Sequence, residues 1–280
     1  MALDQIDVDN LDEKEGDEMS FFDHIAALRG HLVRSFLVLF GVLIAVFCYS
    51  DFLFSDVLQG PTKADFITFR FLCQQNILCF TMPEVKFKTL TLGEAFGTAM
   101  SASFWIALAI SFPYIVWEVW RFVKPGLHKK EQEGAGLMLL IIGLLFAVGL
   151  LFGYYVVAPL AISFLLNFTL PGVTNSEPSI SSYIDNLIAF TIPLGFVFEL
   201  PVIMYFLGRI GIVSAKMLRN SRRYAALILM IIAAVITPSP DAWSMALVFV
   251  PLYGLFEASI WVVAKVDAKR EKEHAEFMKS

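Results

Sequence analysis

The chain has 280 residues, of which 58% are hydrophobic and 17% charged, with a formal net charge of −5 and a mean hydropathy of +0.69. Soluble domains carry about 45–50% apolar and about 25% charged residues, so this composition excludes a soluble globular protein. It indicates an integral membrane protein. The apolar runs follow one another so closely that we expect a single membrane domain with short tails.

Residues 1–20 form an acidic N-terminal tail. The first eighteen residues contain eight Asp or Glu and one Lys, which accounts for the negative net charge. Segments of this kind cannot bury a core, so we expect the tail to be disordered and solvated. It lacks the positively charged start and cleavable apolar core of a signal peptide.

Six apolar runs are candidates for membrane spans, because a bilayer core of about 30 Å needs roughly 20 apolar residues per helix. We therefore expect an all-α polytopic membrane protein with six transmembrane helices in a domain of residues 21–264, followed by a charged tail over 265–280. The expected spans cover residues 32–53, 95–120, 137–160, 184–207, 224–236 and 243–264.

The fifth and sixth helices are expected to be short. The fifth run has only thirteen apolar residues, and Glu257 interrupts the sixth. The sequence TPSPD at residues 237–241 has the chemistry of a helical hairpin, with two Pro and a capping Asp. Either both runs span the membrane or neither does. We favour two spans, with a locally thinned bilayer or neighbouring helices compensating for their short length.

The distribution of Lys and Arg sets the expected orientation. Residues 121–130 hold four, residues 209–223 hold five and the tail from residue 265 holds five, whereas residues 158–183 and 237–242 hold none. By the positive-inside rule both termini are cytoplasmic. The loop over residues 54–94 carries four positive charges on the outer side, but the rule weakens for long loops.

Catalysis is poorly supported by the sequence. The four His residues lie in expected tails or loops, and no metalloprotease, nucleophile-elbow or phosphate-loop motif is present. We therefore expect no enzyme activity, no cofactor, no metal site and no nucleic-acid partner. Cys73 and Cys79 share one loop and are a possible disulfide if that loop faces an oxidising compartment.

Three carboxylates lie within the expected spans. Glu199 stands near the middle of its span, where an ionised side chain costs about 2.5–3.5 kcal/mol. It is either a neutral carboxyl that hydrogen-bonds a neighbouring helix, or a polar site for a partner or water. Pro193 and Pro201 flank it, so we expect the helix to bend there. Glu118 and Glu257 lie nearer the cytoplasmic ends, where an interfacial role is as well supported as a functional one.

The segment RFVKPGLHKKEQEGAG at residues 121–136 has two interpretations. In the first, the segment is a helix boundary: Pro125 and Gly126 end one helix, and the acids Glu131 and Glu133 lie in the first turn of the next, where they interact favourably with the helix dipole. Alternatively, the segment is a cytoplasmic recognition surface, because Phe122, Trp117 and Trp120 accompany the acids, and an aromatic face beside a carboxylate can hold a guanidinium.

Several separated motifs resemble one family across nearly the whole chain after the acidic tail. They are HIAALRGHL before the first span, Pro61 in the following loop, LGEAF at the second span, SFPYIVWEVWRFVKPGLHKKE, FVFELPV, TPSPD and VPLYGLFE. In order and spacing they resemble the TatC family, the multi-spanning receptor subunits of the twin-arginine protein translocase.

The resemblance implies a receptor that binds twin-Arg signal peptides of folded proteins at the cytoplasmic face of a prokaryotic inner membrane. It implies single-span TatA/TatB-type partners and further copies of the chain itself. Phe122 and Glu131 match signal-contact residues, as do Leu28 and Arg29, and Glu199 matches an intramembrane acid. Other motif positions, with structural or partner contacts implied, are Pro61, Glu94, Pro113, Pro125, Asp241, Tyr253 and Glu257.

One position departs from the family pattern. The motif before the first span often carries a Glu where this chain has Ala27. A second acidic contact must therefore come from elsewhere, with Asp23 and Glu133 as candidates, or recognition depends more heavily on Glu131.

Two other functions compete with this one. A proton- or cation-coupled secondary transporter would use Glu199, but such folds usually show repeated halves, and no internal repeat is evident. A scaffold whose short fifth and sixth helices recruit other helices is compatible with the receptor.

Overall fold

The structure is a computed structural model that describes residues 21–63, 65–74, 85–124, 135–168, 177–237 and 242–277, without the side chains of 21–27, 72, 135, 242–244 and 272–277. The described elements are helices, apart from an isolated β-bridge between Lys88 and Ser179. The expected acidic tail over residues 1–20 lies outside the described residues.

Helices of very different length make up the fold. The longest are α1 (Phe21–Cys48), α4 (Glu94–Val123), α6 (Ala135–Phe152), α8 (Ile180–Val197) and α12 (Ala242–Phe277). The shorter ones are α2 (Ser50–Phe52), α3 (Ile67–Gln74), α7 (Ala158–Asn167), α9 (Leu200–Ile210), α10 (Ala215–Asn220) and α11 (Arg222–Ile236). Two π-helical segments, Leu53–Leu58 and Gly153–Val157, and a 3-10 turn, Gly60–Thr62, join some of them.

Five helices in the described part of the chain are long and apolar enough to cross a membrane. They cover Leu28–Cys48, Glu94–Val123, Gly136–Asn167, Ile180–Ile210 and Met245–Glu271. The protein is therefore an all-α polytopic membrane protein, as expected. The residues of the expected fifth span form the helix α11, which is not among these five. Its 15 residues reach only about 22 Å at a rise of about 1.5 Å per residue.

The expectation of a short sixth helix is wrong. α12 has 36 residues and runs past Glu257 without a break. Glu is itself a good helix former, and this carboxylate has partners: Arg222 Nη2 lies 2.7 Å from Oε2, and the Tyr253 hydroxyl donates to Oε1 at 3.1 Å. A paired charge can stay on an apolar helix where an isolated one could not.

Other span boundaries also differ from expectation. The first helix ends at Cys48, short of residue 53, and the third continues through the π-helical segment and α7 to Asn167. The fourth is interrupted between Val197 and Leu200, which separates α8 from α9. Pro201 lies in the first turn of α9, so the break falls at Glu199, where the flanking prolines indicated a bend.

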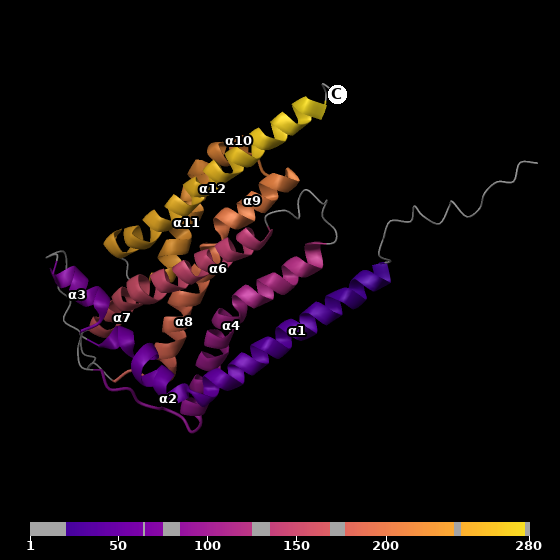
Figure 1. The fold of residues 1–280 in the computed structure, drawn as a ribbon. Coiled ribbons are helices and arrows are strands. Elements are labelled where there is room, and N and C mark those ends of the chain that lie inside the picture. The colour runs from indigo at the N-terminus through magenta and orange to yellow at the C-terminus, as the bar shows by residue number, and fades with distance from the viewer. Residues whose placement is uncertain are drawn as a thin grey trace, which may run out of the picture.

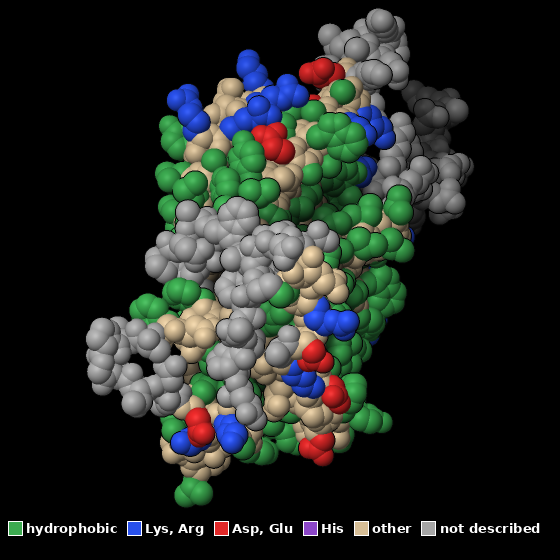
Figure 2. Space-filling view, turned by 90° about the vertical axis from the view of Figure 1, so that its left-hand side faces the viewer, with side chains coloured by type: hydrophobic (Ala, Val, Ile, Leu, Met, Phe, Trp, Pro, Cys, Tyr) green, Lys and Arg blue, Asp and Glu red, His purple; other side chains and the backbone are tan. Residues whose placement is uncertain are grey.

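The helices form two packed groups. α1 lies along α4, and both α4 and α6 pack against α8, whereas α9, α10 and α11 pack on α12 (Figure 1). The start of α1 and the end of α4 lie side by side at one end of the bundle. Figure 2 shows Lys and Arg side chains gathered at the upper end of one face, and another group of charged side chains in its lower part.

α6 and α8 approach closely because glycines remove side chains at their contact. A Cβ atom at Gly149 would lie 2.7 Å from the carbonyl oxygen of Leu194 and 2.9 Å from the Cα of Gly195. A Cβ atom at Gly153, the first residue of the π-helical segment that follows α6, would lie 2.8 Å from the Cα of Thr191 on α8. Small residues spaced four apart let transmembrane helices bring their backbones together.

We predict that Gly149→Ala destabilises the protein by about 1–3 kcal/mol, because the added methyl group meets backbone atoms that cannot rotate away. Thermal unfolding in detergent measures the effect. Gly41→Ala in α1 is the matched control, since in the described part of the chain nothing beyond the helix's own backbone lies within 4 Å of its Cβ position. Equal melting temperatures for the two variants would contradict the importance of this helix contact.

Candidate functional site

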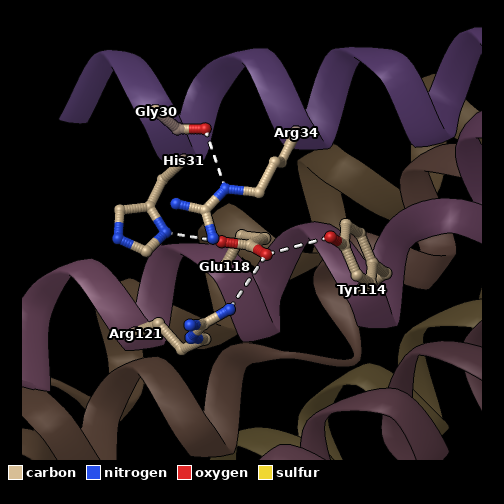
Figure 3. Close-up of polar contacts among 6 residues, drawn as sticks. All are labelled: Gly30, His31, Arg34, Tyr114, Glu118 and Arg121. Atoms are coloured by element: carbon tan, nitrogen blue, oxygen red, sulfur yellow. Dashed lines mark hydrogen bonds and ion pairs between the residues drawn. The ribbon is translucent and has the colours of Figure 1, made fainter. Parts of the chain in front are cut away.

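Glu118, near the C-terminal end of α4, is a buried carboxylate with partners from two helices. Its side chain is 1% exposed. The Nδ1 atom of His31 on α1 lies 2.5 Å from its Oε2, and the hydroxyl of Tyr114, one turn earlier on α4, donates to Oε1 at 2.9 Å (Figure 3). The carboxylate therefore joins the start of α1 to the end of α4.

Two guanidinium groups flank this carboxylate. Arg121 Nη1 lies 3.5 Å from Oε1, and the same guanidinium stands 4.8 Å from the ring centroid of Trp117. Arg34 donates from Nε to the carbonyl oxygen of Gly30 at 3.2 Å, and its guanidinium lies beside the Glu118 carboxylate (Figure 3). A buried charge is tolerated only when it is compensated in this way.

Phe122 lies at the same junction. Its ring is half-buried and meets the ring of His31 edge-on, with centroids 6.1 Å apart. Leu28 and Arg29 are exposed and lie within one turn of His31 on α1. The structure thus gathers Phe122, Leu28 and Arg29 at one end of the bundle, around a carboxylate that the sequence alone does not assign to the site.

Several residues expected at the site lie outside the described residues: Glu131, Glu133, Pro125 and Asp241. The side chains of Asp23 and Ala27 are also outside them. Cys73 is disulfide-bonded, but Cys79 lies outside the described residues, so their pairing stays a prediction. Cys48 is free and exposed.

Glu199 lies elsewhere, at the break between α8 and α9. It is 7% exposed, and its Oε1 has no hydrogen-bond partner within the described residues. A buried polar atom without a partner costs free energy unless water or a partner group satisfies it. Glu199 therefore presents an unused acceptor in the interior of the bundle.

Two other expected positions, Pro61 and Glu94, lie in the turn before α3 and at the start of α4, respectively. Pro61 is buried in the turn after α2, where the hydroxyl of Tyr183 donates to the carbonyl oxygen of Leu58 at 2.5 Å. The Glu94 carboxylate accepts from the backbone N–H groups of Leu90 and of Thr91, the latter at 3.1 Å. Both contacts lie at the opposite end of the bundle from Glu118.

Two further positions lie within the helices. Pro113 is inside α4 and faces Gly143 of α6, whose Cβ position would be 3.5 Å from the proline Cβ. Tyr253 and Glu257 form the network with Arg222 that joins α12 to the start of α11.

The fold and this junction define a multi-spanning membrane protein with a charged and aromatic site at one end of its bundle. The family model described as "Sec-independent protein translocase protein (TatC)" matches residues 23–251. The chain therefore belongs to the TatC family. The members of this family are components of a protein transport system and are not enzymes.

Curated relatives and a solved structure agree with this assignment. The chain is 35% identical to the Sec-independent protein translocase protein TatC of Deinococcus radiodurans, with 90% of this chain and 89% of that one covered. It is 31% identical to the chloroplastic TATC of Pisum sativum, over 88% of this chain and 64% of that one. The crystal structure of a twin arginine translocase receptor, TatC, has a TM-score of 0.65 and 27% identity, and the match covers 87% of this chain and 99% of that one.

We predict that His31→Ala lowers the stability of the protein by about 1–3 kcal/mol, because Glu118 stays buried with one partner fewer. Thermal unfolding in detergent tests this. Leu32→Ala is the control, since Leu32 is the next residue on α1 and is 68% exposed. If both variants unfolded at the same temperature, the histidine contact would contribute nothing measurable.

Proposed function

We propose that this chain is the receptor subunit of a twin-arginine translocase and binds the signal peptides of folded proteins where α1 begins and α4 ends. The observation that carries the proposal is the half-buried Phe122 ring packed on His31, beside a carboxylate and its two guanidiniums. Phe122, Glu131, Leu28 and Arg29 would contact the peptide. The solved relative is a twin arginine translocase receptor, which supports this use of the site.

The energetics require a sheltered contact. An exposed ion pair contributes about 0–1 kcal/mol, which is too little to select one peptide in the cytosol. Hydrogen bonds to charged groups contribute about 1.5–3 kcal/mol each, and a bidentate carboxylate distinguishes the planar fork of Arg from the ammonium of Lys. The hydrophobic segment of the peptide would add apolar packing along the exposed face of α1, which includes Leu32, Phe36 and Phe40.

The proposed topology has six spans, with α11 as a short fifth span and both termini in the cytoplasm. The Lys and Arg residues that follow α9 and begin α11 support it, because they lie at the same end of the bundle as the start of α1. The membrane would be the inner membrane of a prokaryote. A locally thinned bilayer or a neighbouring helix would cover the ends of α11.

The proposed partners are TatA/TatB-type single-span proteins and further copies of this chain. The Oε1 of Glu199, which has no hydrogen-bond partner among the described residues, supports a polar partner or water within the bundle. The exposed apolar side chains of α11, among them Leu227, Ile231 and Val235, support a neighbouring helix or lipid on its outer face.

We predict that the purified protein binds a twin-Arg signal peptide at least about tenfold more tightly than its Lys-Lys counterpart. The reason is the loss of about 1.4 kcal/mol or more when the bidentate contact is lost. Fluorescence anisotropy with labelled peptides in detergent measures both affinities. Equal affinities would contradict a receptor that recognises guanidinium groups.

We also predict that Glu131→Ala weakens binding of the twin-Arg peptide by about tenfold, because one charge-assisted contact disappears. Glu177→Ala is the control: it removes an exposed acid that pairs with Lys88 at 2.7 Å, at the other end of the bundle. An unchanged affinity for Glu131→Ala would show that this acid does not contact the peptide.

A further inference from the structure

Arg121 is already held as a bound guanidinium would be held. Its guanidinium has the Glu118 carboxylate on one side, with Nη1 and Oε1 3.5 Å apart, and the Trp117 ring 4.8 Å away. A carboxylate together with an aromatic face is the combination that binds a guanidinium well. The chain therefore contains a guanidinium site that one of its own side chains occupies.

Arg121 is the most easily replaced partner of Glu118. The contacts of His31 and Tyr114 are short, 2.5 and 2.9 Å, whereas that of Arg121 is 3.5 Å, beyond the usual range for a strong charge-assisted bond. The side chain of Arg121 is also 44% exposed, against 15% for His31. His31 and Tyr114 can therefore keep the carboxylate in place when Arg121 leaves.

The charges around Glu118 favour the replacement of Arg121 by a peptide arginine over the binding of an additional arginine. Arg34 and Arg121 both flank the Glu118 carboxylate, so among the described side chains drawn at this junction the positive charges exceed the negative ones. A third guanidinium would be repelled, because like charges at short range in a partly buried site interact strongly. An incoming arginine that displaced Arg121 would leave the charge at the carboxylate unchanged.

We propose that Glu118 and Trp117 form a subsite for one arginine of the signal peptide, and that Arg121 occupies this subsite until the peptide arrives. The inference rests on the proposed receptor function and names a further binding residue for it. Glu118 then supplies the acidic contact that the sequence lacks at Ala27. Arg121 competes with the peptide for the subsite. This competition lowers the affinity of peptides that cannot make the contacts that Arg121 makes with the Glu118 carboxylate and the Trp117 ring.

The test compares the affinities of full-length variants for a twin-Arg peptide and its Lys-Lys counterpart by fluorescence anisotropy. Arg121→Gln removes the competitor, so the affinity for the twin-Arg peptide should rise several-fold. Glu118→Gln removes the charge, and the affinity should fall about tenfold or more. In the Glu118→Gln background, Arg121→Gln should no longer raise the affinity, because the two residues act at one subsite.

Arg209→Gln is the matched control. Arg209 lies near the end of α9 with its Nη1 3.2 Å from the Tyr205 hydroxyl, so this variant removes one positive charge at the same end of the bundle, on α9 rather than on α1 or α4. A rise in affinity for Arg121→Gln that exceeds the change for Arg209→Gln supports exchange at the subsite. Thermal unfolding of each variant reports whether it is folded. Arg121→Gln changes an exposed side chain, and this substitution leaves the contacts of Glu118 with His31 and Tyr114 in place.

An affinity of Arg121→Gln that is lowered, or that equals that of Arg209→Gln, would overturn the subsite. The proposed receptor function would survive that result if the unmodified protein still preferred the twin-Arg peptide. If the unmodified protein did not distinguish the two peptides, the receptor function itself would fail.

Discussion

The end of the bundle where α1 meets α4 depends on one buried carboxylate. Glu118 is 1% exposed, and a charge at that depth is stable only when polar partners replace the water it has lost. His31 supplies a partner from α1, while Tyr114 and Arg121 supply partners from α4. Because the ring of His31 also contacts Phe122, the interaction that joins the helices also fixes the aromatic wall of the proposed peptide site.

Among the described residues, the buried acids Glu118 and Glu199 differ in how their oxygens are satisfied. The carboxylate of Glu118 is satisfied by groups of the chain itself, whereas Glu199 keeps an oxygen without a partner in the described part of the chain. The first arrangement gives a preorganised junction, in which only the Arg121 contact is long. The second leaves a polar position open at a helix break, where another protein or water can contribute the missing donor. Recognition and assembly can therefore use separate parts of one bundle.

The sequence predicted the parts of this structure that depend on local pattern. Apolar run length located the long helices, and the prolines on both sides of Glu199 indicated the break between α8 and α9. The sequence failed where a contact joins distant segments. His31 and Glu118 are 87 residues apart, and Arg222 and Glu257 are 35 apart, so a single sequence offers no sign that they pair. When those partners are unknown, Glu257 is interpreted as a residue that interrupts a short helix, and Glu118 is interpreted as an acid at the membrane interface.

The most direct measurement is site-specific photocrosslinking of a signal peptide with a photoreactive residue placed next to its two arginines. If the peptide binds where α1 begins and α4 ends, the crosslinks should map to residues 28–31 and 117–124 and should disappear when unlabelled twin-Arg peptide is added in excess. Competed crosslinks that map instead to α12, or to the turn around Pro61 at the other end of the bundle, would contradict the assignment of this junction as the recognition site.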